Sequence, residues 1–120
     1  MTISAAAGNG PRVHILGAAC ALGAPHAGSA HAPSALRSAQ LMRSLIAAGV
    51  DAQWVDTLHP VADTNDAFDM RTRLELNGAF ARTLAKAVAA LPAGVLPFVL
   101  GGDHAIASGT WRGVGRRLGH

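Results

Sequence analysis

The sequence predicts an α/β fold of three layers, α/β/α, with a parallel sheet and the element order β-α-β-α-β-α. Three short apolar or alternating runs predict strands, and the stretches between them carry apolar residues at helical spacing. Such alternation gives parallel strands joined by right-handed crossovers. A chain of 120 residues that is 50% hydrophobic and 14% charged can also form one core. We expect a flexible N-terminal lead-in at residues 1–11 and one domain at residues 12–120.

The first strand is expected at Val13–Leu16, where the run Val-His-Ile-Leu is bounded by Pro11 and Gly17. The following stretch, Gly17–Ala32, is broken by several glycines and a proline, which predicts a long loop. Long loops in compact domains often carry function.

A helix is expected to begin at Pro33 and Ser34 and to end at Gly49, because proline suits a first turn and glycine ends helices. We expect its apolar face to pack on the sheet; the face consists of Leu36, Leu41, Met42, Leu45, Ile46 and Ala48. The alternation in Val50–Val55 then predicts a strand at a sheet edge, followed by a loop over Thr57–Asn65.

A long helix is expected from Asp66 to Leu91, with one apolar stripe made of Met70, Leu74, Asn77, Ala81, Leu84, Val88 and Leu91. The run Val95–Leu100 is continuously apolar, which is typical of an interior parallel strand. The last helix is expected over Ala105–Leu118, with a face made of Ala107, Trp111, Val114 and Leu118.

The distribution of charge argues against a nucleic-acid partner. The net charge is only +3, and most of the arginines are spread along the chain without neighbouring aromatics. Arg112, Arg116 and Arg117 do crowd together, and we expect a solvated helix end there rather than a phosphate clamp.

The sequence also predicts a soluble protein of the cytoplasm with no membrane partner. Residues 1–12 lack the pattern of a secretion signal, and no apolar stretch is long enough to cross a bilayer. Cys20 is the one cysteine, so an internal disulfide is impossible. We expect Cys20 to be a packed core residue, with a catalytic thiol as the alternative.

The candidate site follows the third apolar run, in the segment Gly101-Gly102-Asp103-His104. Ligands of parallel sheets collect beyond the carboxyl ends of the strands, and two glycines permit a sharp turn there. A neutral imidazole is a good ligand for a transition metal, and a neighbouring carboxylate can orient it. The alternative is that Asp103 merely caps the next helix and that His104 is an exposed residue of its first turn.

No second cluster of acids and histidines occurs, although a catalytic metal needs three or more protein ligands. His14 is expected to be a satisfied residue within a strand, and His120 is terminal. The loop histidines His26, His31 and His59 are the ones that could reach the site. Dinucleotide, Walker and serine-elbow motifs are absent.

The segments VHILGAACALGAPHAGSAHAPSALRSAQLMRSLIAAGVDAQWVD and LPFVLGGDHAIASGT resemble the N-terminal part of the arginase and agmatinase (ureohydrolase) family. The Gly-Gly-Asp-His segment is the more specific match. Ala32–Arg37 is similar to the start of the family's first helix, with Ala32 in place of the usual glycine. Ala105 stands where serine is frequent. The absence of the acidic residue that agmatinases tend to carry in the first loop points to arginase.

This resemblance implies a three-layer fold that is incomplete here, and manganese-dependent hydrolysis of the guanidinium of L-arginine to urea and ornithine. In the family two manganese ions lower the pKa of a bridging water. His104 matches the first metal-binding histidine; Asp103, Gly101 and Gly102 are expected to support the site. The substrate would be a small guanidino compound, and a homo-oligomer is expected.

The family's Asp-Ala-His-x-Asp and Asp-x-Asp metal segments do not occur in this sequence. We therefore expect the chain to be an N-terminal fragment that is inactive alone, with an unpaired and apolar outer edge on its third strand. One alternative is a non-catalytic truncated homologue that binds itself or a partner through this edge. Another is a small protein that binds a single metal through His104 and the loop histidines.

Overall fold

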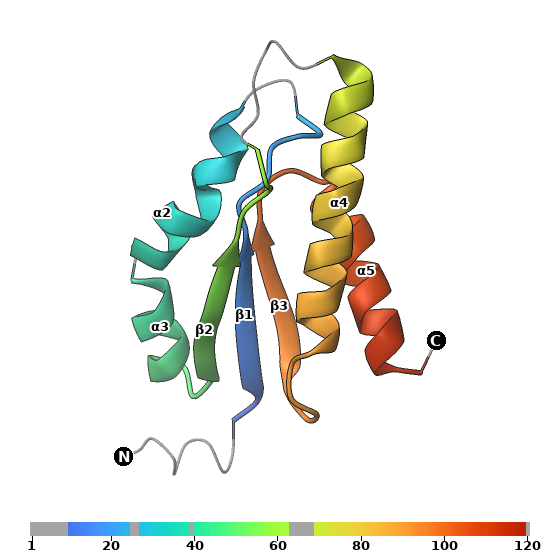
Figure 1. The fold of residues 1–120 in the computed structure, drawn as a ribbon. Helices are drawn as coiled ribbons and strands as arrows, with labels where there is room; N and C mark the ends of the chain where they lie inside the picture. The colour runs from blue at the N-terminus through green and yellow to red at the C-terminus, as the bar shows by residue number, and fades with distance from the viewer. Residues whose placement is uncertain (1–9, 25–26, 39, 63–68, 120) are drawn as a thin grey trace.

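The sheet is parallel and has three strands: β1 (Arg12–Ala18), β2 (Asp51–Leu58) and β3 (Leu96–Gly101), in the order β2-β1-β3 (Figure 1). The computed structural model describes residues 10–24, 27–38, 40–62 and 69–119. Most of the expected lead-in, residues 1–9, therefore lies outside the described residues. The register places Ile15 of β1 beside Trp54 of β2 and Phe98 of β3.

Two predictions about the strands are confirmed, and one needs correction. β2 lies at a sheet edge as expected, although it extends to Leu58, into the expected loop. The outer edge of β3 is unpaired as expected, since β3 pairs only with β1 in the described part of the chain. The prediction that residues 95–100 form an interior strand is therefore wrong for these residues, and β1 occupies the interior position. An apolar run predicts that a strand is buried, but it does not predict the position of that strand in the sheet.

Helices cover both faces of the sheet, which confirms the three-layer α/β/α class. A 3-10 helix, η1 (Ala27–His31), leads into α2 (Ala32–Ser38) and α3 (Leu41–Ala47). These helices lie on one side of the strands in Figure 1, whereas α4 (Met70–Ala89) and α5 (Ile106–Arg117) lie on the other side.

The segment before β2 differs from the single helix and long loop that the sequence predicts. η1 occupies the end of the expected loop, and the helix is divided into α2 and α3. Gln40, at the start of α3, has φ −81° and ψ 27° and makes no side-chain capping bond. The expected apolar face is only partly covered, because Leu36 and Ile46 are exposed and α3 contains no buried residue.

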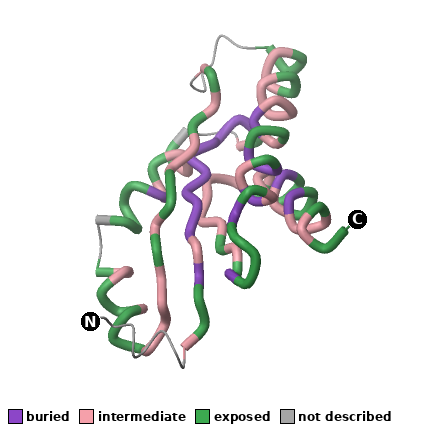
Figure 2. Tube along the Cα trace, turned by 60° about the horizontal axis from the view of Figure 1, so that its bottom comes forward, coloured by how far each residue is buried: buried purple, intermediate pink, exposed green. Residues whose placement is uncertain are grey.

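The core lies between the sheet and α4 (Figure 2). The strand β1 and the segment after it contribute Leu16, Ala18, Cys20 and Leu22, and α4 contributes Phe80, Leu84 and Val88. The predicted stripe of α4 is therefore right for the C-terminal half of the helix. It is wrong for Met70 and Leu74, which are exposed. The helix begins at Met70, after the capping residue Asp69, and residues 63–68 lie outside the described part.

The cap of α4 has an electrostatic consequence. Asp69 accepts a hydrogen bond of 2.7 Å from the backbone N–H of Thr72, and this bond lowers the pKa of the carboxyl group. A carboxylate at a helix N-terminus is also favoured by the helix dipole.

The apolar face expected on α5 is buried only in part, because Val114 packs against the core whereas glycines face α4. Gly109 and Gly113 are buried, whereas Trp111 and Leu118 are exposed. A Cβ atom on Gly113 would lie 2.6 Å from the Cβ of Val88. The absence of side chains at the two glycines therefore allows the axes of α4 and α5 to approach closely.

Arg117 has a structural role that the sequence did not indicate. Its guanidinium donates hydrogen bonds to the backbone carbonyls of Leu91, Pro92 and Val95, after the C-terminus of α4. Carbonyls in that position lack helical partners, so a cation there is favourable. The expected solvated helix end is right for Arg112 and Arg116, which are exposed, and wrong for Arg117.

Candidate functional site

The candidate site forms where the segments after β1 and β3 come together at the carboxyl end of the sheet. The backbone N–H of Asp103 donates to the carbonyl of Cys20 at 3.1 Å, and Ala19 N–H donates to Leu58 O at 2.9 Å. The segments that follow all three strands therefore meet at one end of the sheet, as parallel topology requires.

Gly101 and Gly102 lie so close to neighbouring atoms that a residue with a Cβ atom would not fit at either position. Gly102 has φ +41°, and a Cβ atom on it would overlap the carbonyl oxygen of Cys20 and lie 2.6 Å from that of Ala18. A Cβ atom on Gly101 would overlap the side chain of Ile106. The predicted sharp turn is confirmed, and the glycines also permit a close approach of two backbone segments.

Asp103 connects the two segments through its carboxylate. Oδ1 accepts a hydrogen bond of 2.8 Å from the N–H of Ala105, and Oδ2 accepts one of 2.7 Å from the N–H of Gly23. The N-cap position of α5 is Ala105, so Asp103 is not the capping residue. The cap-only alternative is thus insufficient, because one carboxylate oxygen holds a loop 80 positions away.

Replacement of Asp103 by alanine is expected to lower the free energy of unfolding by about 2–3 kcal/mol, because two hydrogen bonds to a charged acceptor are lost. Chemical denaturation of the two proteins measures this difference. Asp56 provides a control, since in the described part of the chain its carboxylate accepts a bond from the adjacent N–H of Thr57 alone. Asp56→Ala should cost less than about 1 kcal/mol. Equal losses in the two variants would contradict the bridging role of Asp103.

His104 is exposed at the tip of β3, in the turn that precedes α5. This position leaves the imidazole accessible, as a metal ligand requires. However, no group of three or more His, Cys, Asp or Glu side chains capable of holding a metal occurs within the part of the chain that the structure describes. The assignments of His104 as a ligand and of Asp103, Gly101 and Gly102 as its support therefore stay predictions.

Among the described residues, no other histidine joins His104 in a group that could hold a metal ion. His31 and His59 are exposed, and His26 and His120 lie outside the described residues. His14 is partly buried in β1, and its Nδ1 atom is buried without a hydrogen-bond partner among the described residues. The expectation of a satisfied core histidine is therefore wrong for this atom, and the alternative of a residue on a face of the sheet agrees with its position in β1. The described residues give no support to a single-metal site built from loop histidines.

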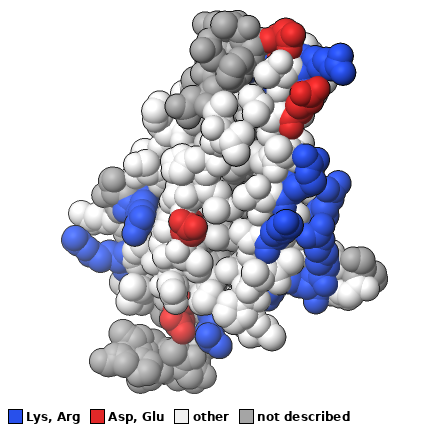
Figure 3. Space-filling view, viewed as in Figure 1, with Lys and Arg blue, Asp and Glu red and all other residues white. Residues whose placement is uncertain are grey.

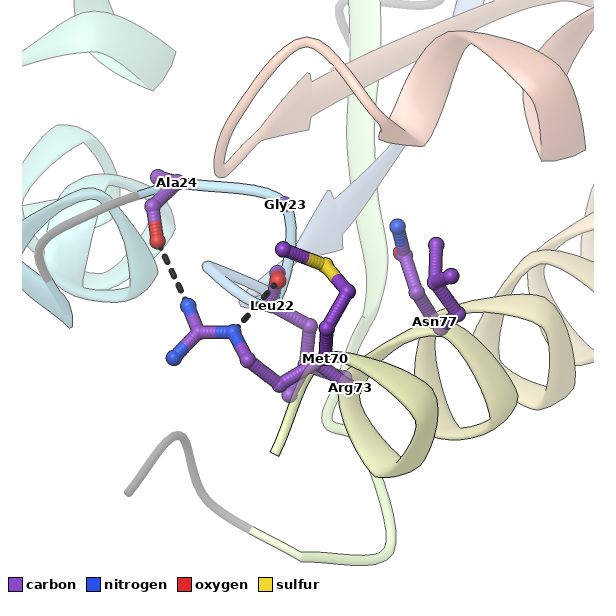
Figure 4. Close-up of a pocket in the computed structure, with 7 residues that line it drawn as sticks. Leu22, Gly23, Ala24, Met70, Arg73 and Asn77 are labelled. Atoms are coloured by element: carbon purple, nitrogen blue, oxygen red, sulfur yellow. Dashed lines mark hydrogen bonds between the residues drawn. The ribbon is translucent and has the colours of Figure 1, made fainter. Parts of the chain in front are cut away.

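A cavity of about 480 Å³ opens beside the loop that Asp103 holds (Figure 4). It is lined by Leu22, Gly23, Ala24, Met70, Arg73, Leu74 and Asn77. Arg73 reaches across from α4 and donates to Ala24 O at 2.6 Å and to Leu22 O at 3.3 Å. Asp103, from the turn after β3, and Arg73, from α4, thus both hold the loop. Sequence analysis missed Arg73, which carries no local signal of this role.

Cys20 is fully buried beneath the loop, with its Sγ atom 4.0 Å from Oδ1 of Asn77. Burial raises the pKa of the thiol, and the carboxylate of Asp103 raises it further. A raised pKa and lack of access both disfavour the thiolate that a nucleophile needs. The expectation of a packed cysteine is confirmed.

The fold and the position of the motif define a class: a parallel α/β unit with an Asp-His pair at the carboxyl end of a strand. The chain belongs to the arginase family, which matches residues 11–120. Two solved structures are similar, the arginases of Bacillus cereus and of Bacillus subtilis subsp. subtilis str. 168, each with 26% sequence identity and a TM-score of 0.73. Each alignment covers 88% of this chain, but only 35% and 36% of the respective arginase.

The chain therefore spans about a third of the length of these solved arginases. Among curated protein sequences, none gives a significant match. The resemblance to the arginase family drawn from the Gly-Gly-Asp-His segment is confirmed. No helix in the described ranges is long and apolar enough to cross a membrane.

Proposed function

We propose that this chain contributes to an arginase-type ureohydrolase, with His104 as one ligand of a manganese site that hydrolyses the guanidinium of L-arginine to urea and ornithine. The observation that carries the proposal is the position of His104. The imidazole is exposed at the end of β3, in a turn fixed by Asp103, within a chain that matches the family over residues 11–120.

The described residues do not by themselves fit a pair of manganese ions. Within the described ranges, His104 belongs to no group of three or more His, Cys, Asp or Glu side chains that could hold a metal ion. The Asp103 oxygens already accept bonds from Ala105 and Gly23, although a carboxylate oxygen retains further lone pairs. We therefore assign Asp103 the task of positioning the His104 turn.

We propose that the loop after β1 forms one side of the site at His104. Asp103 and Arg73 bind this loop from two elements, so hydrogen bonds connect the turn bearing His104, the loop after β1 and α4. Binding constellations depend on such support, because small displacements of a ligand side chain weaken a metal site. A small guanidino compound is the proposed substrate.

The purified 120-residue chain is expected to release no urea from arginine in the presence of Mn²⁺, because it supplies too few ligands. Urea release by this chain alone would contradict the proposal. If the same gene encodes the remaining ligands, the nucleotide sequence after codon 120 should encode an Asp-Ala-His-x-Asp segment in one of its reading frames.

In a protein extended through such a segment, His104→Asn should lower manganese-dependent urea release by about 100-fold or more, since a ligand is lost. His59→Asn is the matched control, because His59 is also an exposed histidine beyond a strand. Manganese content, measured by elemental analysis, should fall only in the His104 variant. Full activity of His104→Asn would refute the assignment.

A further inference from the structure

Arg73 differs from the other cations of α4 in where its side chain points. Arg71, Arg82 and Lys86 are exposed, and Lys and Arg side chains gather along the side formed by α4 and α5 in Figure 3. Arg73 is half-buried, and its guanidinium points to the loop after β1 (Figure 4). Its place on the helix is therefore suited to holding another segment of the chain.

The loop is held through three consecutive residues, by bonds of alternating polarity. Arg73 donates to the carbonyls of Leu22 at 3.3 Å and of Ala24 at 2.6 Å. Between them, the N–H of Gly23 donates to Oδ2 of Asp103 at 2.7 Å. Leu22 is buried whereas Gly23 is exposed, so the chain leaves the core at this point. Hydrogen bonds to side chains then fix a backbone that core packing no longer holds.

The loop is also in close contact with the turn that carries His104. A Cβ atom on Gly23 would lie 2.9 Å from the Cβ of Ala105 and 3.1 Å from Oδ2 of Asp103, so there is no room for a methyl group between loop and turn. Oδ1 of the same carboxylate accepts a bond of 2.8 Å from the N–H of Ala105, on the C-terminal side of His104. A shift of Gly23 would therefore move this carboxylate or break its bond to the loop.

We propose that Arg73 is a positioning residue for His104: it holds the loop after β1, and the loop sets the conformation of the His104 turn through Gly23 and Asp103. α4 carries no part of the Gly-Gly-Asp-His motif, yet it then controls the geometry of the motif. The importance of this connection for catalysis rests on the function proposed for His104, but the connection itself does not.

Amide hydrogen exchange in the purified 120-residue chain, followed by NMR, tests the connection. In Arg73→Ala, the amides of Gly23 and Ala105 should exchange about 10-fold faster or more, because both donate to Asp103 and their bonds should open more often. The amide of Asp103 should change less, since its bond to the carbonyl of Cys20 does not involve the loop at Gly23. Arg73→Lys should restore part of the protection, because an ammonium group also donates to carbonyls.

Arg71→Ala is the matched control, because Arg71 is an exposed cation of the same helix and pairs with Glu75 at 3.3 Å. It should leave exchange at Gly23 and Ala105 unchanged. Unchanged exchange at these two amides in Arg73→Ala would overturn the proposal.

Leu16, which is buried in the central strand β1, reports global unfolding. A merely structural role of Arg73 would accelerate exchange at Leu16 by the same factor as at Gly23 and Ala105. The proposal predicts a larger factor in the loop and the turn, and equal factors would overturn it.

Activity separates this proposal from the proposed function. In a protein extended through an Asp-Ala-His-x-Asp segment, Arg73→Ala should lower kcat for urea release by about 10-fold, because a displaced ligand side chain weakens the site, and Arg73→Lys should recover part of it. An unchanged kcat in Arg73→Ala would overturn the positioning role, even where His104→Asn is inactive. Full activity of His104→Asn would instead refute the function proposed for His104, and the exchange measurements would still decide whether Arg73 holds the turn.

Discussion

Gly113→Ala is expected to destabilise the protein by about 1–3 kcal/mol, although alanine usually stabilises a helix interior. The Cβ atom would lie 2.6 Å from the Cβ of Val88 and 2.8 Å from the carbonyl oxygen of Ala85. Relief of these overlaps requires α5 to move away from α4, and the core beside Leu84 would then open. Chemical denaturation at fixed protein concentration measures the effect, because any association contributes to apparent stability.

Gly78→Ala is the matched control in the same pair of helices. The nearest atom to a Cβ on Gly78 is Nη1 of Arg82 at 3.7 Å, which is ordinary contact distance. This variant should therefore gain about 0.5–1 kcal/mol from the higher helix propensity of alanine. A Gly113→Ala protein as stable as Gly78→Ala would show that α4 and α5 are not in close glycine-mediated contact.

The same glycines explain why the packing of α5 could not be predicted from sequence. Helical periodicity ranks faces by apolar side chains, and by that measure Ala107, Trp111, Val114 and Leu118 form one face. Val114 packs against the core, but Trp111 and Leu118 are exposed. The contact with α4 instead selects the face with the smallest residues, Gly109 and Gly113. That choice depends on the surface of a helix some 30 positions earlier in the chain, which no local pattern contains.

The strands were easier to predict than the packing of α5, because each is an apolar or alternating run bounded by glycine or proline. The parallel class follows from the alternation of strands and helices, and β1, β2 and β3 all lie within two or three residues of their expected bounds. Strand order was not predictable in the same way. The apolar run of β3 indicated an interior strand, yet β3 has one open edge in the described residues.

For the candidate site, the sequence identified the motif but not the contacts that hold it. The Asp-His pair at the end of β3 was predicted from residue types and position alone. The bond from Gly23 to Asp103 and the bonds from Arg73 to the same loop join residues 80 and about 50 positions apart. Such pairs arise from tertiary packing, so the supporting role of Arg73 had no sequence signal.

Gly102→Ala is expected to have the larger effect on the site, with a loss of about 2–5 kcal/mol in the free energy of unfolding. Two costs combine in this variant. The residue has φ +41°, which L side chains disfavour, and its Cβ atom would overlap the backbone carbonyl of Cys20. The bond from Asp103 N–H to Cys20 O should then break, and the His104 turn should lose its anchor on the β1 segment.

Gly94→Ala separates the two costs. Gly94 also has a positive φ, +84°, but a Cβ atom there would meet nothing within 4 Å. This variant should therefore lose only the conformational cost of about 1–2 kcal/mol. Thermal and chemical unfolding of both variants give the difference, which measures the overlap with the backbone of Ala18 and Cys20. If Gly102→Ala cost no more than Gly94→Ala, the two backbone segments would not be in contact, and the loop after β1 could not be the wall of a site at His104.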